Sequence, residues 1–180
     1  GLGIPAEPLF RSYKCVFRTI FSSTMGISVA AGSVFWNLLF HPTAGLLNRV
    51  VQWFGGEPIG WLTDTNFAVY SIAAVSIWMN IGFSYLVIMG GLKNIDDSHY
   101  ESVEIVGGGF FYRLRKVTIP LISPSLFFVV TISLINAFQS FGLIDMLTGG
   151  GPNNSTNLMV YKLYNDAFVN FRFGSASAQG

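Results

Sequence analysis

The sequence predicts an all-α protein, a polytopic bundle of transmembrane helices, and two observations lead to this fold class. Of its 180 residues, 51% are hydrophobic and only 11% are charged, whereas a soluble domain carries about 25% charged residues. Residues 19–40, 67–92 and 117–144 contain no charge, and each run exceeds the roughly 20 apolar residues that a spanning helix needs. The alternative is three buried helices of a soluble protein, but such helices seldom run beyond about 20 residues without a charge.

Composition also narrows the function. The net charge of +1 gives no basis for nucleic-acid binding. Cys15 is the only cysteine, so an intrachain disulfide is excluded, and with His41 and His99 isolated the sequence argues against a metal or nucleophile–histidine site. The chain begins with Gly1, and residues 173–180 read as the opening of another helix. We therefore expect a fragment of a longer membrane protein, with three complete spans and part of a fourth.

Basic residues predict the topology of the three spans, because they collect in cytoplasmic loops. They are Arg11, Lys14 and Arg18 before the first run, Arg49 between the first and second, and Lys93, Arg113, Arg115 and Lys116 between the second and third. The N-terminal end and residues 93–116 are therefore expected in the cytoplasm. Residues 41–66 and 145–172 are expected outside, as two extracytoplasmic segments of one membrane domain that includes all of residues 1–180.

Each extracytoplasmic segment has an apolar helical pattern. In residues 41–66 the pattern predicts a short helix at the membrane surface. In residues 145–172 a loop rich in Gly, Pro and Asn precedes an expected amphipathic helix. The apolar positions are Leu46, Leu47, Val50, Val51 and Phe54 in the first segment, and Leu158, Tyr161, Tyr164, Phe168 and Phe171 in the second.

A polar segment, residues 93–116, separates the second and third runs. Residues 95–106 are expected to form a short helix with two aspartates and a serine at its start, where the helix dipole favours negative groups and caps. Gly107, Gly108 and Gly109 should end that helix, because glycine permits a positive φ and a sharp reversal.

The second half of this segment leads back to the membrane. Residues 110–117 are expected to resume as a second short helix that carries basic side chains near the headgroups. Pro120 and Pro124 fall in the first turns of the third run, where proline leaves the carbonyls of Lys116 and Pro120 without their usual amide donors. The segment is therefore expected to form a helix–turn–helix at the cytoplasmic surface. Its glycine turn suits the docking of a soluble protein.

Other interpretations of this segment fit less well. A phosphate-binding loop would need Lys and Ser or Thr after the glycines, but Phe110 and Phe111 stand there. Glu101 and Glu104 share one helix face, yet no acid–base partner or enclosing pocket is apparent for a catalytic pair. On physical grounds alone, an ordinary connecting loop with solvated charges remains open.

The stretch YESVEIVGGGFFYRLRKVTIPLISP resembles the cytoplasmic signature loop of permease subunits of binding-protein-dependent ABC importers. That loop runs Glu-Ala-Ala, three residues, Gly, and about nine residues to an Ile-x-Leu-Pro-like end. Glu101 matches the Glu and Gly107 the central Gly, and the Ile119-Pro120 pair with Pro124 matches the end.

Two further blocks extend the resemblance from Phe17 to the C-terminus. FRTIFSSTMGISVAAGSVFWNLLFHPTAGLLN is similar to the family's third-helix region, without the usual Leu-Pro, and MLTGGGPNNSTNLMVYKLYNDAFVNFRFGSASAQ is similar to the outer stretch of the carbohydrate-type subfamily. Within the signature loop, Ser102 and Val103 replace the usual Ala-Ala, Val106 replaces a common Asp, and Gly108 replaces a common Ala. These departures leave docking plausible and put the strength of coupling in question.

The resemblance implies a multi-pass subunit of a prokaryotic cytoplasmic (inner) membrane that is not itself an enzyme. Its implied partners are cytoplasmic ABC ATPase subunits that bind ATP and Mg²⁺, a second and different permease subunit, and an extracytoplasmic solute-binding protein; this chain would hold no cofactor. The implied coupling helix lies within residues 95–109. The residues assigned to coupling are Glu101, Ser102, Val103, Gly107, Gly108, Gly109 and Pro120.

Polar side chains within the second and third runs mark a candidate substrate path. They are Ser76, Asn80 and Ser84 in the second run, and Ser133, Asn136, Gln139 and Ser140, expected in one stripe, in the third. Polar atoms in hydrocarbon are costly unless satisfied, so helix–helix hydrogen bonds and contact with solute both remain open. The resemblance implies a sugar or oligosaccharide as solute, with glycerol-3-phosphate as the alternative. A membrane scaffold or receptor that moves no solute is the rival of another class.

Overall fold

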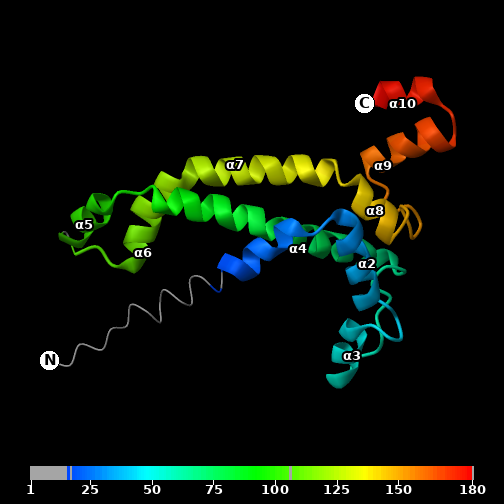
Figure 1. The fold of residues 1–180 in the computed structure, drawn as a ribbon, viewed down its shortest axis with the longest axis horizontal. Helices are drawn as coiled ribbons and strands as arrows, with labels where there is room; N and C mark the ends of the chain where they lie inside the picture. Colours follow the sequence, from blue (N-terminus) through cyan, green and yellow to red (C-terminus); the bar gives the residue numbers. More distant parts are fainter. Residues whose placement is uncertain (1–15, 17, 106, 180) are drawn as a thin grey trace. The chain divides into compact units, whose positions relative to one another are not determined.

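The computed structural model describes residues 16, 18–105 and 107–179, and every regular element among them is a helix (Figure 1). These residues fall into two compact units. One unit contains the helical turns that end at Gly26 together with Asn80–Leu134, and the other contains Ile27–Met79 and residues 135–179. The all-α prediction is therefore confirmed for the described residues.

Two helices are long and apolar enough to cross a membrane. Helix α4 runs from Thr65 to Lys93, so the span predicted at residues 67–92 is confirmed. The other runs from Phe110 to Phe138. It joins α6 (Phe110–Arg113), a π-helical segment η2 (Leu114–Thr118) and α7 (Ile119–Phe138).

The bounds predicted for this last span, residues 117–144, are wrong at both ends. Its helix begins seven residues earlier, at Phe110, because α6 and η2 lead into α7 without a break. It ends at Phe138, and a separate helix, α8 (Phe141–Leu147), follows. The N–H of Phe141 turns back to the carbonyl of Gln139 at 2.7 Å, which ends the helical ladder. The break after Phe138 introduces no charge, so hydropathy could not reveal it. The extension toward Phe110 adds Arg113, Arg115 and Lys116, and these charges had set the start of the predicted run.

The two prolines of α7 are accommodated in different ways. The hydroxyl of Ser123 donates to the carbonyl of Pro120 at 2.8 Å, which satisfies the oxygen that Pro124 leaves without an amide donor. Before Pro120 the helix widens, and the N–H of Ile119 bonds the carbonyl of Leu114 in π register. A wider turn relieves the clash between a proline ring and the carbonyl four residues earlier.

The first predicted span, residues 19–40, is not one continuous helix. Helical structure ends with a 3₁₀ turn, η1 (Thr24–Gly26), and α2 begins at Val29 and ends at Leu39. Ser28 has extended backbone angles and caps α2, because its hydroxyl accepts the N–H of Ala31 at 3.2 Å. Residues 18–26 and α2 have, taken together, the length and composition of one broken span.

The second unit has the larger hydrophobic core. It joins residues of α2, α4 and α8 with Tyr161 of α9 (Met159–Tyr164). The core residues are Phe40, Ile72, Val75, Leu143, Ile144, Leu147 and Tyr161. Around it lie the short helices α3 (Leu46–Trp53), the π-helical η3 (Asn165–Val169) and α10 (Phe173–Gln179).

The amphipathic helix predicted after the outer loop is only partly correct. Tyr161 is buried in the core, as its apolar face requires. Phe168 and Phe171 are mostly exposed instead, and Phe171 has a positive φ beyond the end of η3. The ring of Phe168 packs against Tyr164 with 5.4 Å between ring centres, and the turn after η3 takes Phe171 off the helix.

Candidate functional site

The segment between the two long helices folds as predicted around a short helix, α5 (Asp97–Ile105). A carboxylate oxygen of Asp96 accepts the N–H of Ser98 at 3.1 Å and so caps the first turn. This N–H, with the Ser98 hydroxyl and nearby His99, holds the pKa of Asp96 below its usual value. Glu101 and Ser102 are exposed on α5, and the Ser102 hydroxyl bonds the carbonyl of Ser98 at 2.8 Å.

The glycine turn closes α5 in the way that the sequence predicts. Gly107 has φ +75°, and the N–H of Gly108 donates to the carbonyl of Val103 at 3.0 Å. A left-handed residue followed by this long backbone bond is a Schellman motif, which satisfies a carbonyl at the end of a helix. The chain then turns into α6, with Gly109 at its N-cap. Val106 lies outside the described residues.

The three glycines differ in whether the turn requires them and for what physical reason. A Cβ at Gly107 would meet open space, but the positive φ disfavours any other residue. A Cβ at Gly108 would approach Val103 Cγ1 more closely than the 3.0 Å that real Cβ atoms keep, and would lie 3.0 Å from Tyr112 Cδ1. A Cβ at Gly109 would meet neither obstacle, because its φ is −68° and nothing lies within 4 Å. Gly107 is therefore required by its backbone conformation, and Gly108 by the limited space around it.

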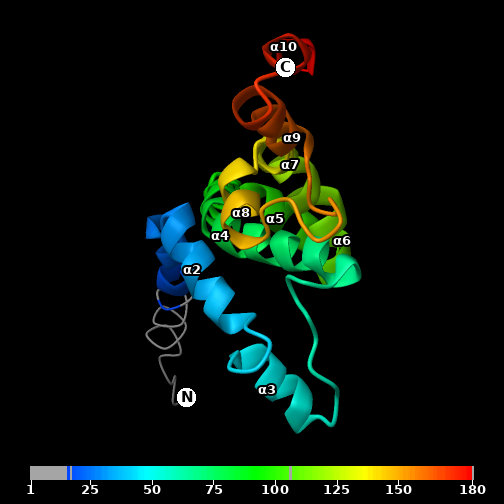
Figure 2. The same cartoon turned by 90° about the vertical axis from the view of Figure 1, so that its right-hand side faces the viewer.

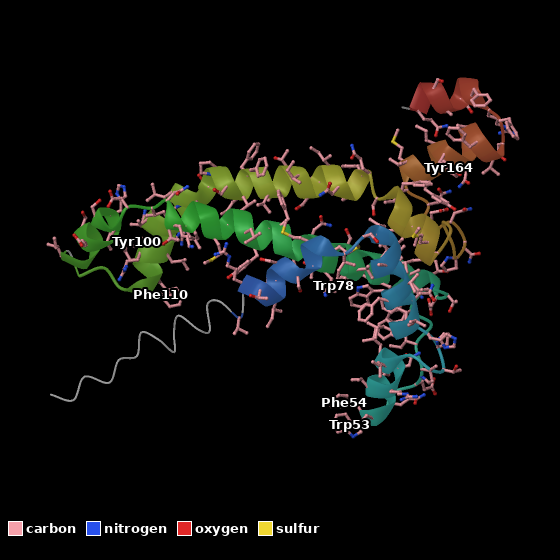
Figure 3. All side chains as sticks on the ribbon, in the orientation of Figure 1. Trp53, Phe54, Trp78, Tyr100, Phe110 and Tyr164 are labelled. Atoms are coloured by element: carbon pink, nitrogen blue, oxygen red, sulfur yellow. The ribbon has the colours of Figure 1, made fainter. Side chains whose placement is uncertain are left out.

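A side-chain clasp joins α5 to the start of the long helix, and the sequence analysis did not identify it. The hydroxyl of Tyr100 lies 3.3 Å from the hydroxyl of Thr118. The guanidinium of Arg113 lies 5.2 Å from the centre of the Tyr100 ring, within the range of a cation–π interaction. Figure 3 shows Tyr100 among the helices at this end of the unit. Tyr100 and Thr118 are 18 residues apart, so no local pattern reveals their contact.

This clasp places the coupling residues relative to the long helix. Glu101, Ser102 and Val103 follow Tyr100 on α5, and Pro120 stands two residues after Thr118 in the first turn of α7. A displacement of α5 would therefore reach α7 through Tyr100 and Thr118. Pro120 is among the residues expected to take part in coupling, and the side-chain contacts between the helices come from Tyr100, Arg113 and Thr118.

The polar residues of α4 lie within a continuous helix. Ser84 donates its hydroxyl to the carbonyl of Asn80 at 3.1 Å, so its hydrogen bond is satisfied within the helix. Asn80 and Ser84 are half-buried. Their spacing of four residues places them on one face, as the sequence predicts.

The stripe expected on the third span is wrong at its C-terminal end. Ser133 and Asn136 lie on α7 and are exposed. Gln139 and Ser140 lie beyond Phe138, in the break between α7 and α8, so they do not continue the helical face. The structure therefore places two members of the stripe on a helix and two in a turn.

Comparison with known proteins agrees with the geometry. A model of the family described as "binding-protein-dependent transport system inner membrane component" matches residues 1–178. The chain is 34% identical, over 92% of its length, to the sn-glycerol-3-phosphate transport system permease protein UgpA of Agrobacterium fabrum. It is 30% identical, over 96% of its length, to the probable ABC transporter permease protein YurN of Bacillus subtilis. It spans 57% and 60% of these relatives, respectively.

Solved structures share the fold. A bacterial alginate ABC transporter in complex with an alginate pentasaccharide-bound periplasmic protein contains a chain that superposes with a TM-score of 0.85 at 21% identity, over 94% of this chain and 59% of that one. A chain of a bacterial ABC transporter involved in the import of alginate superposes with a TM-score of 0.84, over 99% of this chain and 66% of that one. The family match and the relatives lead to one conclusion: this chain belongs to the binding-protein-dependent transport system inner membrane components.

Proposed function

We propose that this chain is part of the membrane-spanning subunit of an ATP-driven importer, and that it takes up sugars or oligosaccharides. The observation that carries the proposal is the clasp between α5 and the long helix, since it joins an exposed cytoplasmic element to a span. In this proposal the chain binds no cofactor. Cytoplasmic ATPase subunits bind ATP and Mg²⁺, a second permease subunit completes the path, and an extracytoplasmic binding protein delivers the solute.

Coupling would occur through α5. Its exposed residues Glu101 and Ser102 would contact a groove of the ATPase subunit, and the tight Gly108 turn would let the partner surface come close. Movement of the ATPase subunit would then pass from α5 through Tyr100 to Thr118, where the long helix enters the membrane. The short side-chain path favours a rigid-body response of the two helices.

Replacing Glu101 by alanine tests this coupling. Glu101→Ala should leave the complex assembled in the membrane while ATP hydrolysis no longer drives transport. His99→Ala is the matched control, because His99 is exposed on the same helix and points about 200° away from Glu101. Uptake and ATP hydrolysis are measured together in proteoliposomes. Full transport by Glu101→Ala would count against the docking role.

The nature of the solute rests on the polar residues of the path. Asn80, Asn136 and Gln139 offer neutral amides, and Trp78 supplies an aromatic face, a combination that suits sugars. The three uncharged runs contain no Lys or Arg to bind a phosphate. Glycerol-3-phosphate is the second candidate because several relatives at 30% identity or more carry the name of sn-glycerol-3-phosphate permeases.

A ligand panel distinguishes the two solute classes. The full complex is reconstituted in liposomes, and its ATPase activity is measured with the binding protein loaded in turn with sugars, oligosaccharides or glycerol-3-phosphate. Stimulation by one ligand identifies the solute. If no ligand stimulates an assembled complex that binds ATP, the scaffold alternative gains support. Asn136→Leu and Gln139→Leu then test the path, since unchanged affinity and rate would remove both residues from it.

A further inference from the structure

Helix α3 presents an apolar face that no other described residue covers. Leu46 and Val50 are at least half exposed, and Trp53 and Phe54 are 85% and 81% exposed. Figure 3 shows both aromatic side chains at the end of the helix. At about 100° per residue, these four positions fall within an arc of roughly 100°. The exposed apolar groups of α3 therefore form one continuous face.

The opposite side of α3 is held by a buried asparagine. Asn48 is 1% exposed, and its amide donates to the carbonyls of Pro42 at 2.8 Å and Ile59 at 3.0 Å. Its oxygen accepts the N–H of Ile59 at 3.0 Å and the indole N–H of Trp61 at 2.9 Å. These four bonds satisfy the amide fully, because a primary amide has two donors and two acceptor sites. Rotation of α3 about its axis would break all of them.

These bonds also fix the distance between α3 and the spans. Pro42 lies three residues after the end of α2 at Leu39, and Trp61 lies four residues before the start of α4 at Thr65. The Ser71 hydroxyl of α4 donates to the carbonyl of Trp61 at 2.7 Å. Figure 2 shows α3 next to the C-terminal end of α2. Helix α3 is thus attached directly to the end of α2 and to the start of the spanning helix α4.

From this arrangement we infer that α3 is an interfacial anchor whose face of Leu46, Val50, Trp53 and Phe54 inserts among the phospholipids of the adjoining leaflet. Tryptophan is enriched at the boundary between headgroups and acyl chains, where its ring is both apolar and able to donate a hydrogen bond. Arg49 is exposed beside this face and lies about 40° from Trp53 on the helix. A guanidinium at this position can bind lipid phosphates while its stem covers apolar surface.

Continuity with the membrane-spanning helices favours lipid over a protein partner. A helix that lies six residues after one span and eleven before the next cannot move far from the membrane surface. The Asn48 bonds then determine which face it presents. A rigid apolar face that carries Trp53 and lies at the membrane surface can contact lipid without any further change in the structure. The inference requires that the chain is embedded in a membrane, but it does not depend on transport or on the identity of the solute.

Spin labels on α3 test the anchor in the assembled complex in nanodiscs of phosphatidylcholine and phosphatidylglycerol, which expose both membrane surfaces to water. Single cysteines replace Val50, Trp53 or, as the matched control, Gln52, whose side chain lies about 100° away from Trp53. Collision rates are measured with oxygen, which concentrates in lipid, and with a water-soluble nickel chelate. We expect an oxygen-to-nickel ratio at positions 50 and 53 at least about threefold above that at position 52.

Two results would overturn the inference. Equal ratios at positions 50, 52 and 53, with high nickel collision rates, would show that the face lies in water. Low collision rates with both reagents at positions 50 and 53 would show that protein covers the face. Repeating the measurement with and without the binding protein would then distinguish that protein from a permanent neighbour such as the second permease subunit.

Discussion

The glycine turn of α5 allows a test in which one substitution adds a methyl group and a second removes the side-chain atoms that it would strike. In Gly108→Ala the new Cβ would collide with Val103 Cγ1 and would lie 3.1 Å from the Val103 carbonyl oxygen. That oxygen cannot retreat without breaking its bond to the Gly108 N–H, which is 3.0 Å long. The valine methyl cannot rotate away easily either, because β-branched side chains in helices strongly prefer one rotamer.

The expected cost follows from this overpacking. An extra methyl group in a closely packed site destabilises by about 1 to 3 kcal/mol. This corresponds to a rise of about 5- to 140-fold in the population of the open turn. Hydrogen exchange of the Gly108 amide (the alanine amide in the variant), measured in the intact complex, reports this opening directly. Exchange should therefore accelerate by that factor in Gly108→Ala.

The second substitution makes the reasoning refutable. Val103→Ala removes the obstructing methyl group, so the double variant Val103→Ala/Gly108→Ala should recover most of the lost protection. The family resemblance implies alanine at both positions, so the valine and the glycine here would compensate each other in size. Gly107→Ala should also destabilise the turn, by about 1 to 2 kcal/mol because of its positive φ, but Val103→Ala should not rescue it. Gly109→Ala should leave exchange unchanged or slow it slightly. Unchanged exchange in Gly108→Ala, or equal rescue of Gly107→Ala, would refute this account.

Three further predictions concern other contacts. Tyr100→Phe removes the hydroxyl contact to Thr118 but keeps the ring beside Arg113, so we expect the contact between α5 and the long helix to weaken by about 0.5 to 1.5 kcal/mol. Hydrogen exchange in α5 should become faster, and less solute should be moved per ATP hydrolysed. An unchanged ratio of solute moved to ATP hydrolysed would exclude the clasp from coupling. Asn48→Ala leaves the N–H groups of Ile59 and Trp61 without their acceptor, which costs about 1 to 3 kcal/mol of stability for each group. The thermal stability of the complex should therefore fall. Unchanged thermal stability would contradict the role of these bonds. Because the pKa of Asp96 is lowered in the folded state, its stabilisation of α5 is present above the carboxyl pKa of the unfolded chain and is lost as the pH falls through the lower folded value. Asp96→Asn should therefore remove this pH dependence from hydrogen exchange in α5. If the pH dependence persists in Asp96→Asn, another group causes it.

Sequence reasoning succeeded where one local signal dominates. The uncharged run at residues 67–92 predicted α4 within two residues at each end. The glycine triplet predicted the end of α5 and the positive φ of Gly107. In both cases the deciding property, apolar length or backbone freedom, belongs to the residues themselves.

Breaks inside uncharged runs could not be predicted in the same way. The run at residues 19–40 is interrupted before Val29, and the run at residues 117–144 is interrupted after Phe138, yet neither interruption introduces a charge. Both depend on local hydrogen bonds, such as the one that the Ala31 N–H donates to the Ser28 hydroxyl. The clasp between Tyr100 and Thr118 and the four bonds of Asn48 depend on contacts between residues distant in the sequence, which no periodicity reveals.

The central claim is that α5 docks on the cytoplasmic ATPase subunit, and cross-linking tests it most directly. A cysteine in place of the exposed Ser102 carries a short photoactivatable cross-linker in the complete complex, and Asn153 in the predicted outer loop carries the same label as a control. The account predicts a product that joins permease and ATPase subunits from position 102, with a yield that changes when ATP binds, and none from position 153. An assembled complex that gives this product from position 153 and not from position 102 would contradict both the docking role of α5 and the proposed topology.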